Sequence, residues 1–454
     1  MTGRLLGRID LRLADCREVL RSLPDCSVHV VVTDPPYEIG MMGSKWDSTG
    51  IAFDRELWTE MLRVLTPGAH VFAFGAPKTW HWLACAMELA GFEPRDSIAW
   101  IQGEGMAHGA NIGKRIDKEA GAVRDTPTNA DWRPVDGRTV GKCSGCGRTN
   151  GGQPGNCQCD KRGTPATPEA AKWEGWNTTL APKHEPIVVM RKPIERGLTE
   201  AANVLKWGTG ALNIDACRLP GGKRTPYGDR EPVATTGRGA VYGSGHGGYP
   251  LGSGHDAQSG RWPPNVALDE AAAAELRARV GARTSGARSG GSYAKGRDGS
   301  HGAPDVRHHD VAPASTHGPD AFFFCPKAPT GERDRGCEHL RWMRDHVLGW
   351  RPAEPGETPD LVGNPHPTVK PLALMRWLLR LGTPPGGRAF DPFIGSGTTA
   401  VAAVIEGIDL LGCDLTPWAL TVAKARTAWA EGRGPELAAT ADDPHAPVQG
   451  SLFR

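Results

Sequence analysis

The chain has 454 residues, 39% of them hydrophobic and 23% charged, and a formal net charge of +2. This length allows about three domains or one fold with insertions, while 60 Gly and 38 Pro indicate loop-rich segments. A nearly neutral charge excludes a strongly basic nucleic-acid binder, so any attraction to phosphates must come from local patches. The chain has no apolar run of membrane-spanning length and no signal-peptide pattern, so we expect a cytoplasmic protein without a membrane partner.

The first predicted elements are a strand at residues 9–13, a short helix at 17–23 and a strand at 28–33. Val30, Val31 and Val32 make the second strand rich in β-branched residues, which favours a buried strand of a parallel sheet. Asp15 follows the first strand, and its position alone favours a helix N-cap.

The second strand ends at Asp34-Pro35-Pro36-Tyr37, where two prolines restrict the backbone to a stiff turn. In open α/β sheets, ligands bind at the carboxyl ends of strands. Asp34 and the Pro35 carbonyl can accept the protons of an exocyclic amine, and Tyr37 can stack on the base that carries it. The alternative is an ordinary loop breaker, because short motifs often occur by chance.

A repeating order of helices and strands follows this turn. It predicts an α/β fold with a doubly wound, mostly parallel sheet. A polar loop at 41–47 is interpreted as a lid over the turn. The predicted elements are a helix at 53–65, a strand at 70–74, a helix at 78–89 and a strand at 97–101.

Residues 102–182 lose this periodicity and contain four cysteines: Cys143, Cys146, Cys157 and Cys159. Four thiolates at this spacing can close a tetrahedral zinc site. Only one residue separates the second pair, so a flexible loop with free thiols is the alternative.

Residues 183–206 contain another predicted strand of the sheet, at 187–190. Residues 207–363 are rich in Gly and Arg, with a basic stretch at 277–307 that could follow a phosphate backbone. A solvated connector is the alternative that this composition favours.

The C-terminal part regains periodicity, with a helix at 372–381 and a strand that ends in Asp391-Pro-Phe-Ile-Gly-Ser-Gly-Thr-Thr. A helix at 399–406 and a strand at 409–413, closing on Asp414, come next. Glycines in such a loop let the backbone approach a nucleotide-like ligand, and the helix N-terminus favours negative charge. The Gly-x-Gly-x-x-Ala spacing alone also occurs in dehydrogenases.

These two motifs together resemble the amino-methylating DNA methyltransferases that use S-adenosylmethionine. Their order resembles the circularly permuted β group of that family, and the likeness covers about residues 8–101, 183–206 and 364–430. The resemblance implies a Rossmann-like methyltransferase fold, circularly permuted, with loop-rich insertions. The chain would begin where an unpermuted relative connects the strand ending at Asp414 to the one ending at Asp15.

The resemblance also implies a role for each segment. Residues 1–101 would be the catalytic half of the methyltransferase domain, and 364–432 the cofactor-binding half. The segment 102–182 would be an insertion, 183–206 a sheet strand of the catalytic domain, 207–363 a target-recognition region and 433–454 a flexible tail.

Site residues follow from the same resemblance. The catalytic turn is Asp34, Pro35, Pro36 and Tyr37. For the cofactor, Asp15 would contact the adenine ring, Asp391 the methionine amino group and Asp414 the ribose. Phe393, Gly395, Gly397 and Thr398 would form the cofactor loop, and Thr368 and Lys370 would contact the methionine end.

The expected function is methyl transfer from S-adenosylmethionine to the N6 amine of adenine in double-stranded DNA. Cytosine N4 is the alternative, although relatives acting on cytosine more often begin the turn with Ser than with Asp. RNA as the substrate, a nicotinamide-dependent oxidoreductase and a non-catalytic DNA-binding protein are more distant alternatives. A homodimer and a cognate restriction endonuclease are further partners to test.

Overall fold

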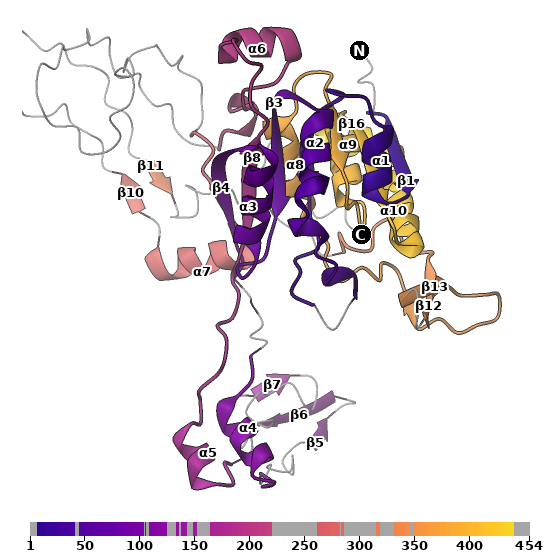
Figure 1. Cartoon of the computed structure of the whole chain (residues 1–454). Helices are drawn as coiled ribbons and strands as arrows, with labels where there is room; N and C mark the ends of the chain where they lie inside the picture. The colour runs from indigo at the N-terminus through magenta and orange to yellow at the C-terminus, as the bar shows by residue number, and fades with distance from the viewer. Residues whose placement is uncertain are drawn as a thin grey trace, which may run out of the picture. The chain divides into compact units, whose positions relative to one another are not determined.

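The computed structural model describes residues 7–40, 45–103, 105, 109–124, 133–135, 138–142, 149–151, 164–219, 261–281, 283–285, 315–317, 331–345 and 349–439. The chain divides into two compact units, residues 104–183 and the remainder. Figure 1 shows both units, with labels on helices and strands where there is room.

The larger unit is built on an eight-stranded sheet in the order β1-β16-β15-β2-β3-β8-β4-β9. Neighbouring strands are parallel, except that β8 runs antiparallel to both β3 and β4. The fold is therefore α/β with a mostly parallel sheet, as predicted. The strands are β1 (Ile9–Leu13), β2 (Val28–Thr33), β3 (Leu65–Phe74), β4 (Glu93–Ile101), β8 (His184–Arg191), β9 (Val266–Leu268), β15 (Arg388–Asp391) and β16 (Asp409–Asp414).

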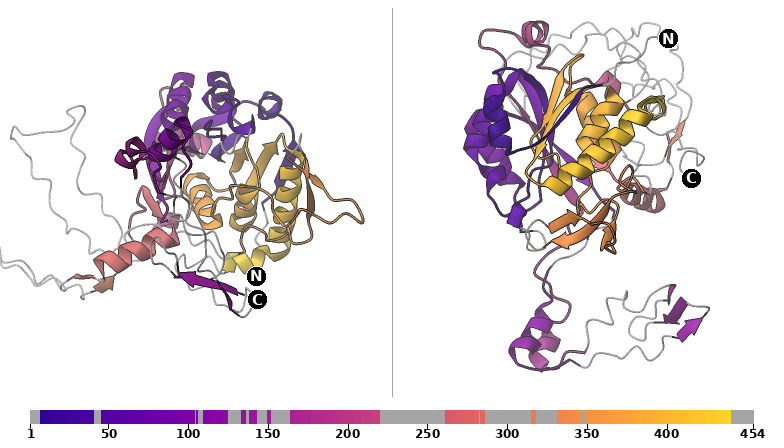
Figure 2. Two further views of the ribbon diagram at one scale, coloured as in Figure 1. Left: turned by 90° about the horizontal axis from the view of Figure 1, so that it is seen from below. Right: turned by 90° about the vertical axis from the view of Figure 1, so that its right-hand side faces the viewer.

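Helices cover both faces of this sheet, because its strands are apolar on both sides (Figure 2). Val30 and Val32 of β2 pack in one hydrophobic cluster, and Val31 packs in the other. One face carries α1 (Cys16–Ser22), α2 (Arg55–Val64) and α3 (Trp80–Ala90); the other carries α8 (Leu372–Gly382), α9 (Thr398–Glu406) and α10 (Pro417–Ala439). These alternating contacts fix the register of β2 against its neighbours.

Parallel pairing brings both ends of the sequence into one sheet. Strand β1 pairs with β16, and Leu13 lies opposite Asp414. Strand β15 lies between β16 and β2, so the turn after β2 and the loop after β15 share one edge. The adjacency of β1 and β16 agrees with a permuted order, but the permutation itself stays a prediction.

The helix before β3 ends earlier than predicted. We expected Pro67-Gly68 to end a helix at residue 65, but α2 ends at Val64 and β3 begins at Leu65. The backbone N–H of Ser27 donates to the Val64 carbonyl at 2.8 Å, and Val28 pairs with Leu65. Pairing with β2 therefore outweighs the tendency of Pro67-Gly68 to form a turn, and both residues lie within β3.

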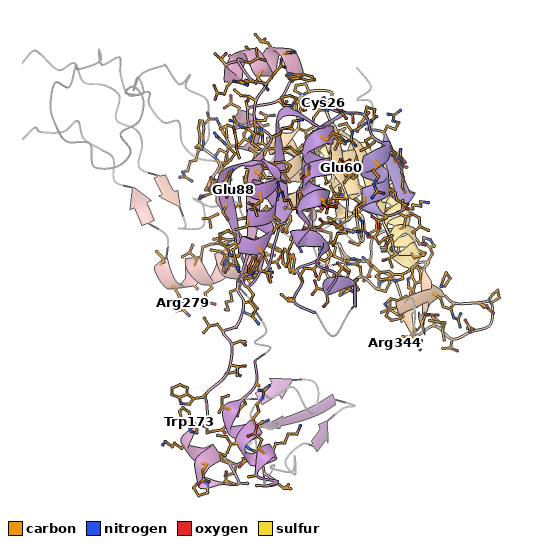
Figure 3. The ribbon with its side chains drawn as sticks, viewed as in Figure 1. Cys26, Glu60, Glu88, Trp173, Arg279 and Arg344 are labelled. Atoms are coloured by element: carbon orange, nitrogen blue, oxygen red, sulfur yellow. The ribbon has the colours of Figure 1, made fainter. Side chains whose placement is uncertain are left out.

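The larger unit also contains α6 (Glu200–Trp207), α7 (Glu270–Val280) and the strand pair β10 (Arg283–Ser285) and β11 (Ser315–His317). A three-stranded sheet consists of β12 (Arg341–Asp345), β13 (Gly349–Pro352) and β14 (Leu361–Val362). Its buried Trp342 packs with Val422 of α10. Arg344, labelled in Figure 3, lies over the Trp350 ring at 5.3 Å from its centroid.

The smaller unit contains α4 (Ile112–Glu119), α5 (Pro168–Lys172) and the strands β5 (Arg133–Val135), β6 (Arg138–Lys142) and β7 (Thr149–Gly151). Buried Asp117 joins its helices by accepting hydrogen bonds from the Thr167 hydroxyl and from Arg124. Cys143, Cys146, Cys157 and Cys159 lie outside the described residues, so the zinc site stays a prediction. None of the described helices is long and apolar enough to cross a membrane.

Candidate active site

Two strand ends meet at one edge of the sheet. The Thr33 hydroxyl, at the end of β2, donates to Oδ1 of Asp391 at 2.8 Å, although 358 positions separate them. A cavity of about 680 Å³ opens between the two ends. Predicted site residues that line it are Asp34, Pro35, Pro36, Tyr37, Thr368, Lys370, Asp391, Phe393, Gly395, Thr398 and Asp414.

Asp34 forms an ion pair on one side and leaves an acceptor on the other. Its Oδ2 accepts a hydrogen bond from Lys370 Nζ at 2.7 Å. Its Oδ1 is buried and makes no hydrogen bond within the described part of the chain. Removal from bulk water raises the pKa of Asp34, which outweighs the attraction of Lys370. An unpaired buried acceptor is costly to keep, so it marks a position where a donor from a ligand would be stabilising.

Lys370, which the family resemblance assigned to the methionine end of the cofactor, forms an ion pair with Asp34. Besides Asp34, its Nζ is 3.4 Å from Oε2 of Glu185. It also lies 5.2 Å from the centroid of the Tyr37 ring and 5.1 Å from that of Phe74. Burial opposes the charge of Lys370, but the two carboxylates prevail and raise its pKa.

Glu185, on β8, is a site residue that the sequence did not reveal. It accepts hydrogen bonds from the Tyr37 hydroxyl at 2.7 Å and from Gln102 at 2.6 Å. Burial opposes its ionisation, but Lys370 and these donors lower the pKa of its carboxyl group. The signal in the sequence was an acidic residue directly before the apolar run 186–190 of β8.

The glycine loop has the backbone conformation that its residues predict. Gly395 and Gly397 have φ angles of +49° and +78°, in the left-handed region. A Cβ on Gly397 would lie 2.7 Å from the Cα of Ala423. The Asp414 carboxylate holds the loop by accepting from Gly395 N–H at 3.0 Å and from Thr416 N–H at 2.8 Å.

Asp391 is buried and fully engaged within the protein. Oδ1 accepts from the Phe393 N–H in addition to Thr33, and Oδ2 accepts from the Thr399 hydroxyl at 2.6 Å. Burial raises the pKa of Asp391 to about 7, which outweighs these hydrogen bonds. These hydrogen bonds connect the glycine loop to Thr33 at the end of β2.

Arg426, on α10, forms hydrogen bonds to the same loop, and the sequence analysis did not predict this role. Its buried guanidinium donates to the Ser396 carbonyl at 2.9 Å and to the Thr398 hydroxyl at 2.9 Å. Its position in the middle of a helix carries no sequence signal for this contact. His366 contacts the loop at Gly395, where a Cβ would lie 2.9 Å from its ring. Burial lowers the pKa of His366 to about 4.

Two predicted cofactor residues do not line the cavity. Gly397, the N-cap residue of α9, is buried. Asp15 caps α1 by accepting from Arg17 N–H at 2.8 Å, and pairs with the Arg17 guanidinium at 2.6 Å. The helix cap expected from its position alone is therefore present, and its adjacent residues Ala14, Cys16 and Arg17 line the cavity. A cofactor contact by Asp15 stays a prediction.

The cavity thus combines an aromatic ring and a free carboxylate oxygen at one end with a glycine loop and helix N-terminus at the other. Such a site can hold a planar amine-bearing ligand beside a nucleotide-like one. No cluster of metal-ligating side chains occurs among the residues that the structure describes.

Comparisons with known proteins agree on one family. The DNA methylase model N6_N4_Mtase matches residues 28–220 and 326–425, which together exceed half of the chain. "Putative methylase YubD" of Escherichia coli (strain K12) is 39% identical over 72 residues, covering 14% of this chain and 32% of that protein. "Type II methyltransferase M.HindIII" of Haemophilus influenzae is 26% identical over 160 residues, covering 35% of this chain and 37% of its own. The chain therefore spans about a third of the length of these curated relatives.

Solved structures of DNA methyltransferases also align with the chain. The complex of M1.HpyAVI with SAM aligns at a TM-score of 0.34 and 12% identity, covering 92% of this chain and 100% of that one. The cytosine-N4-specific PvuII DNA methyltransferase aligns at a TM-score of 0.42 and 10% identity, covering 97% of this chain and 95% of its own. At such low scores these alignments establish neither fold nor function. On the family match, this chain belongs to the DNA methylase family of N6 and N4 methyltransferases.

Proposed function

We propose that this protein transfers a methyl group from S-adenosylmethionine to the exocyclic N6 amine of adenine in DNA. The observation that carries the proposal is the buried Oδ1 of Asp34, which has no protein donor among the described residues and belongs to a side chain of the cavity shared with the glycine loop. A DNA amine is a donor of the kind this oxygen lacks.

The target base would have to leave the DNA stack, at a cost of a few kcal/mol, and enter the cavity beside Tyr37. Asp34 Oδ1 and the Pro35 carbonyl would accept the two amine protons, and the Tyr37 ring would stack on the base. The ring is oriented by its hydroxyl, which donates to Glu185, and the Tyr37 backbone is held by the Thr79 hydroxyl, which donates to its carbonyl at 2.7 Å. Such positioning can contribute about 7–11 kcal/mol toward reaction.

The glycine loop fits S-adenosylmethionine. Gly395 lines the cavity without a side chain, and a Cβ there would lie 2.9 Å from the His366 ring; α9 begins two residues after Ser396. The residues proposed to hold the cofactor are Phe393, Gly395 and Thr398 of the loop, with Asp414 at the ribose, Asp391 and Thr368 toward the methionine end, and Asp15 near the adenine. The bound cofactor supplies a methyl group activated by a positively charged sulfur.

Asp34 also suits the charge change during transfer. The amine nitrogen becomes positive as it gains the methyl group, and Oδ1 of Asp34 would hold the proton that it loses. Removal from water raises the pKa of Asp34, which makes it a better proton acceptor than an exposed carboxylate. No covalent nucleophile is required for this chemistry.

Adenine is proposed over cytosine because the turn begins with Asp34, whereas relatives that act on the cytosine amine more often have Ser there. Double-stranded DNA is the proposed substrate. A homodimer and a cognate restriction endonuclease stay predictions.

The test is to express the gene in a host whose DNA carries no methylated bases and to sequence that DNA for modifications. N6-methyladenine at a defined sequence is the expected result, and Asp34→Ala should leave the DNA unmodified. N4-methylcytosine would instead support the alternative target. Unmodified DNA from a strain with abundant folded protein, together with no tritium transfer from labelled cofactor in vitro, would refute the proposal.

A further inference from the structure

Glu185 has an unusual set of partners for a strand residue. Its side chain is 22% exposed and contacts Tyr37, Lys370 and Gln102. Tyr37 and Lys370 both line the cavity. A carboxylate shielded from water is costly, and is retained only where charged or hydrogen-bonding partners compensate it.

Of these partners, Lys370 also determines how Asp34 is presented to a ligand. Lys370 lies between the two carboxylates, 2.7 Å from Asp34 Oδ2 and 3.4 Å from Glu185 Oε2. Because Lys370 occupies Oδ2, only Oδ1 of Asp34 is left for a ligand. Glu185 thus influences Asp34 through Lys370. It also influences the orientation of the Tyr37 ring, because it accepts a hydrogen bond from the Tyr37 hydroxyl.

We propose that Glu185 is a positioning residue that holds the Lys370 ammonium and the Tyr37 ring, so that one carboxylate oxygen of Asp34 faces the target base. The inference rests on the proposed function, since it concerns the geometry of the same base pocket. Glu185 acts through Lys370 and Tyr37 and does not touch the reacting atoms.

Loss of the Glu185 charge has a defined consequence. Lys370 would keep one carboxylate partner, and the Tyr37 hydroxyl would lose a charged acceptor. Gln has nearly the same shape as Glu, so Glu185→Gln removes the charge without opening a cavity. Misplacement of reacting groups by about 1 Å can reduce rates about a hundredfold, so we expect kcat for methyl transfer to fall between about tenfold and a hundredfold.

A matched control lies on the same pair of strands. Glu93 of β4 pairs with Arg191 of β8 at 2.6 Å, and neither residue lines the cavity. Glu93→Gln therefore removes an ion pair between β4 and β8 that has no part in the site. It should leave kcat within about twofold of the wild type.

The experiment uses the full chain and methylation-free genomic DNA, with kcat, KM for DNA and calorimetric affinity for S-adenosylmethionine measured for each variant. Glu185→Gln should bind the cofactor within about threefold of the wild type while losing kcat. The double variant Glu185→Gln/Lys370→Met should lose no more activity than Lys370→Met alone, because both changes interrupt one chain of contacts.

The pH profile supplies a readout that a purely structural role would not move. Titratable groups around Lys370 are Asp34 after β2, Glu185 on β8, Tyr37 and His366. Glu185 helps raise the pKa of Lys370, so Glu185→Gln should shift the alkaline loss of activity to lower pH. Rescue by Glu185→Asp should be partial, since the charge returns at a shorter reach.

Equal kcat in Glu185→Gln and wild type would overturn the inference, as would an equal loss in Glu93→Gln. An unchanged alkaline limb, or independent losses in the double variant, would also overturn it. A folded wild type that methylates no DNA refutes the proposed function itself. An active wild type with a fully active Glu185→Gln variant refutes only this inference.

Discussion

The carboxylates at the two ends of the cavity differ in how many of their oxygens accept hydrogen bonds from the protein. At the turn after β2, Asp34 has one oxygen paired with Lys370 and the other without a described donor. At the glycine loop, both oxygens of Asp391 and both of Asp414 accept hydrogen bonds from the protein. One end keeps an acceptor for a ligand, while the other uses carboxylates to hold a backbone shape.

This difference shows how one cavity can serve two ligands. A ligand at the glycine loop would meet the backbone at Gly395, which lines the cavity without a side chain. A ligand at the Asp34 turn would meet a side-chain acceptor and an aromatic ring. Substitutions at the first end should therefore affect cofactor affinity, and those at the second should affect transfer.

The largest effect should come from Asp34→Ala. Removing the free acceptor should reduce methyl transfer by at least about a hundredfold, as loss of one oriented polar group in an active site does. Affinity for S-adenosylmethionine should change less than about threefold, because Asp34 is not part of the glycine loop. Transfer assays on methylation-free DNA and calorimetry measure the two quantities. A parallel loss of cofactor binding would show that the two ends are not separable.

Gly397→Ala tests the other end. Its Cβ would lie 2.7 Å from the Cα of Ala423 at a φ of +78°, so the loop must shift. We expect at least about a tenfold loss of cofactor affinity and a cost of about 1–3 kcal/mol in unfolding free energy. Gly386→Ala is the control, since Gly386 also has positive φ but has nothing within 4 Å of the added Cβ. An equal loss of cofactor affinity in both variants would contradict the proposed cradle.

The smallest effect concerns the buried carboxylate of Asp391. Because burial raises its pKa from 3.8 to about 7, the folded state binds a proton that the unfolded state releases. Its contribution to stability is therefore greatest below about pH 4, and it falls as pH rises toward 7. Asp391→Asn removes this titration. The free energy of unfolding of the wild type, relative to that of the variant, should therefore fall by more than about 1 kcal/mol as pH rises from about 4 to 7.

Denaturant unfolding of both proteins between pH 4 and pH 7.5 measures this difference. A pH-independent difference would mean that Asp391 stays ionised throughout. Glu332, whose pKa burial also raises to about 7, is present in both proteins and cancels in the comparison.

Much of the fold and part of the site could be predicted from local sequence patterns. The valines of β2 and the prolines after it determine a buried strand and a stiff turn, and β2 has the predicted bounds. The glycines of the second motif predicted a loop before a helix, and both adopt the positive φ angles that favour glycine. Such features depend on neighbours along the chain, so the sequence carries them directly.

Only the tertiary structure decided which distant side chains complete the site. Lys370 and Asp34 are 336 positions apart, and Tyr37 and Glu185 are 148 apart. Their contacts follow from the strand order, because parallel pairing and the antiparallel β8 bring these segments to one sheet edge. No local pattern encodes a pairing across such separations, so the ion-paired cluster and the Arg426 support appeared only with the fold.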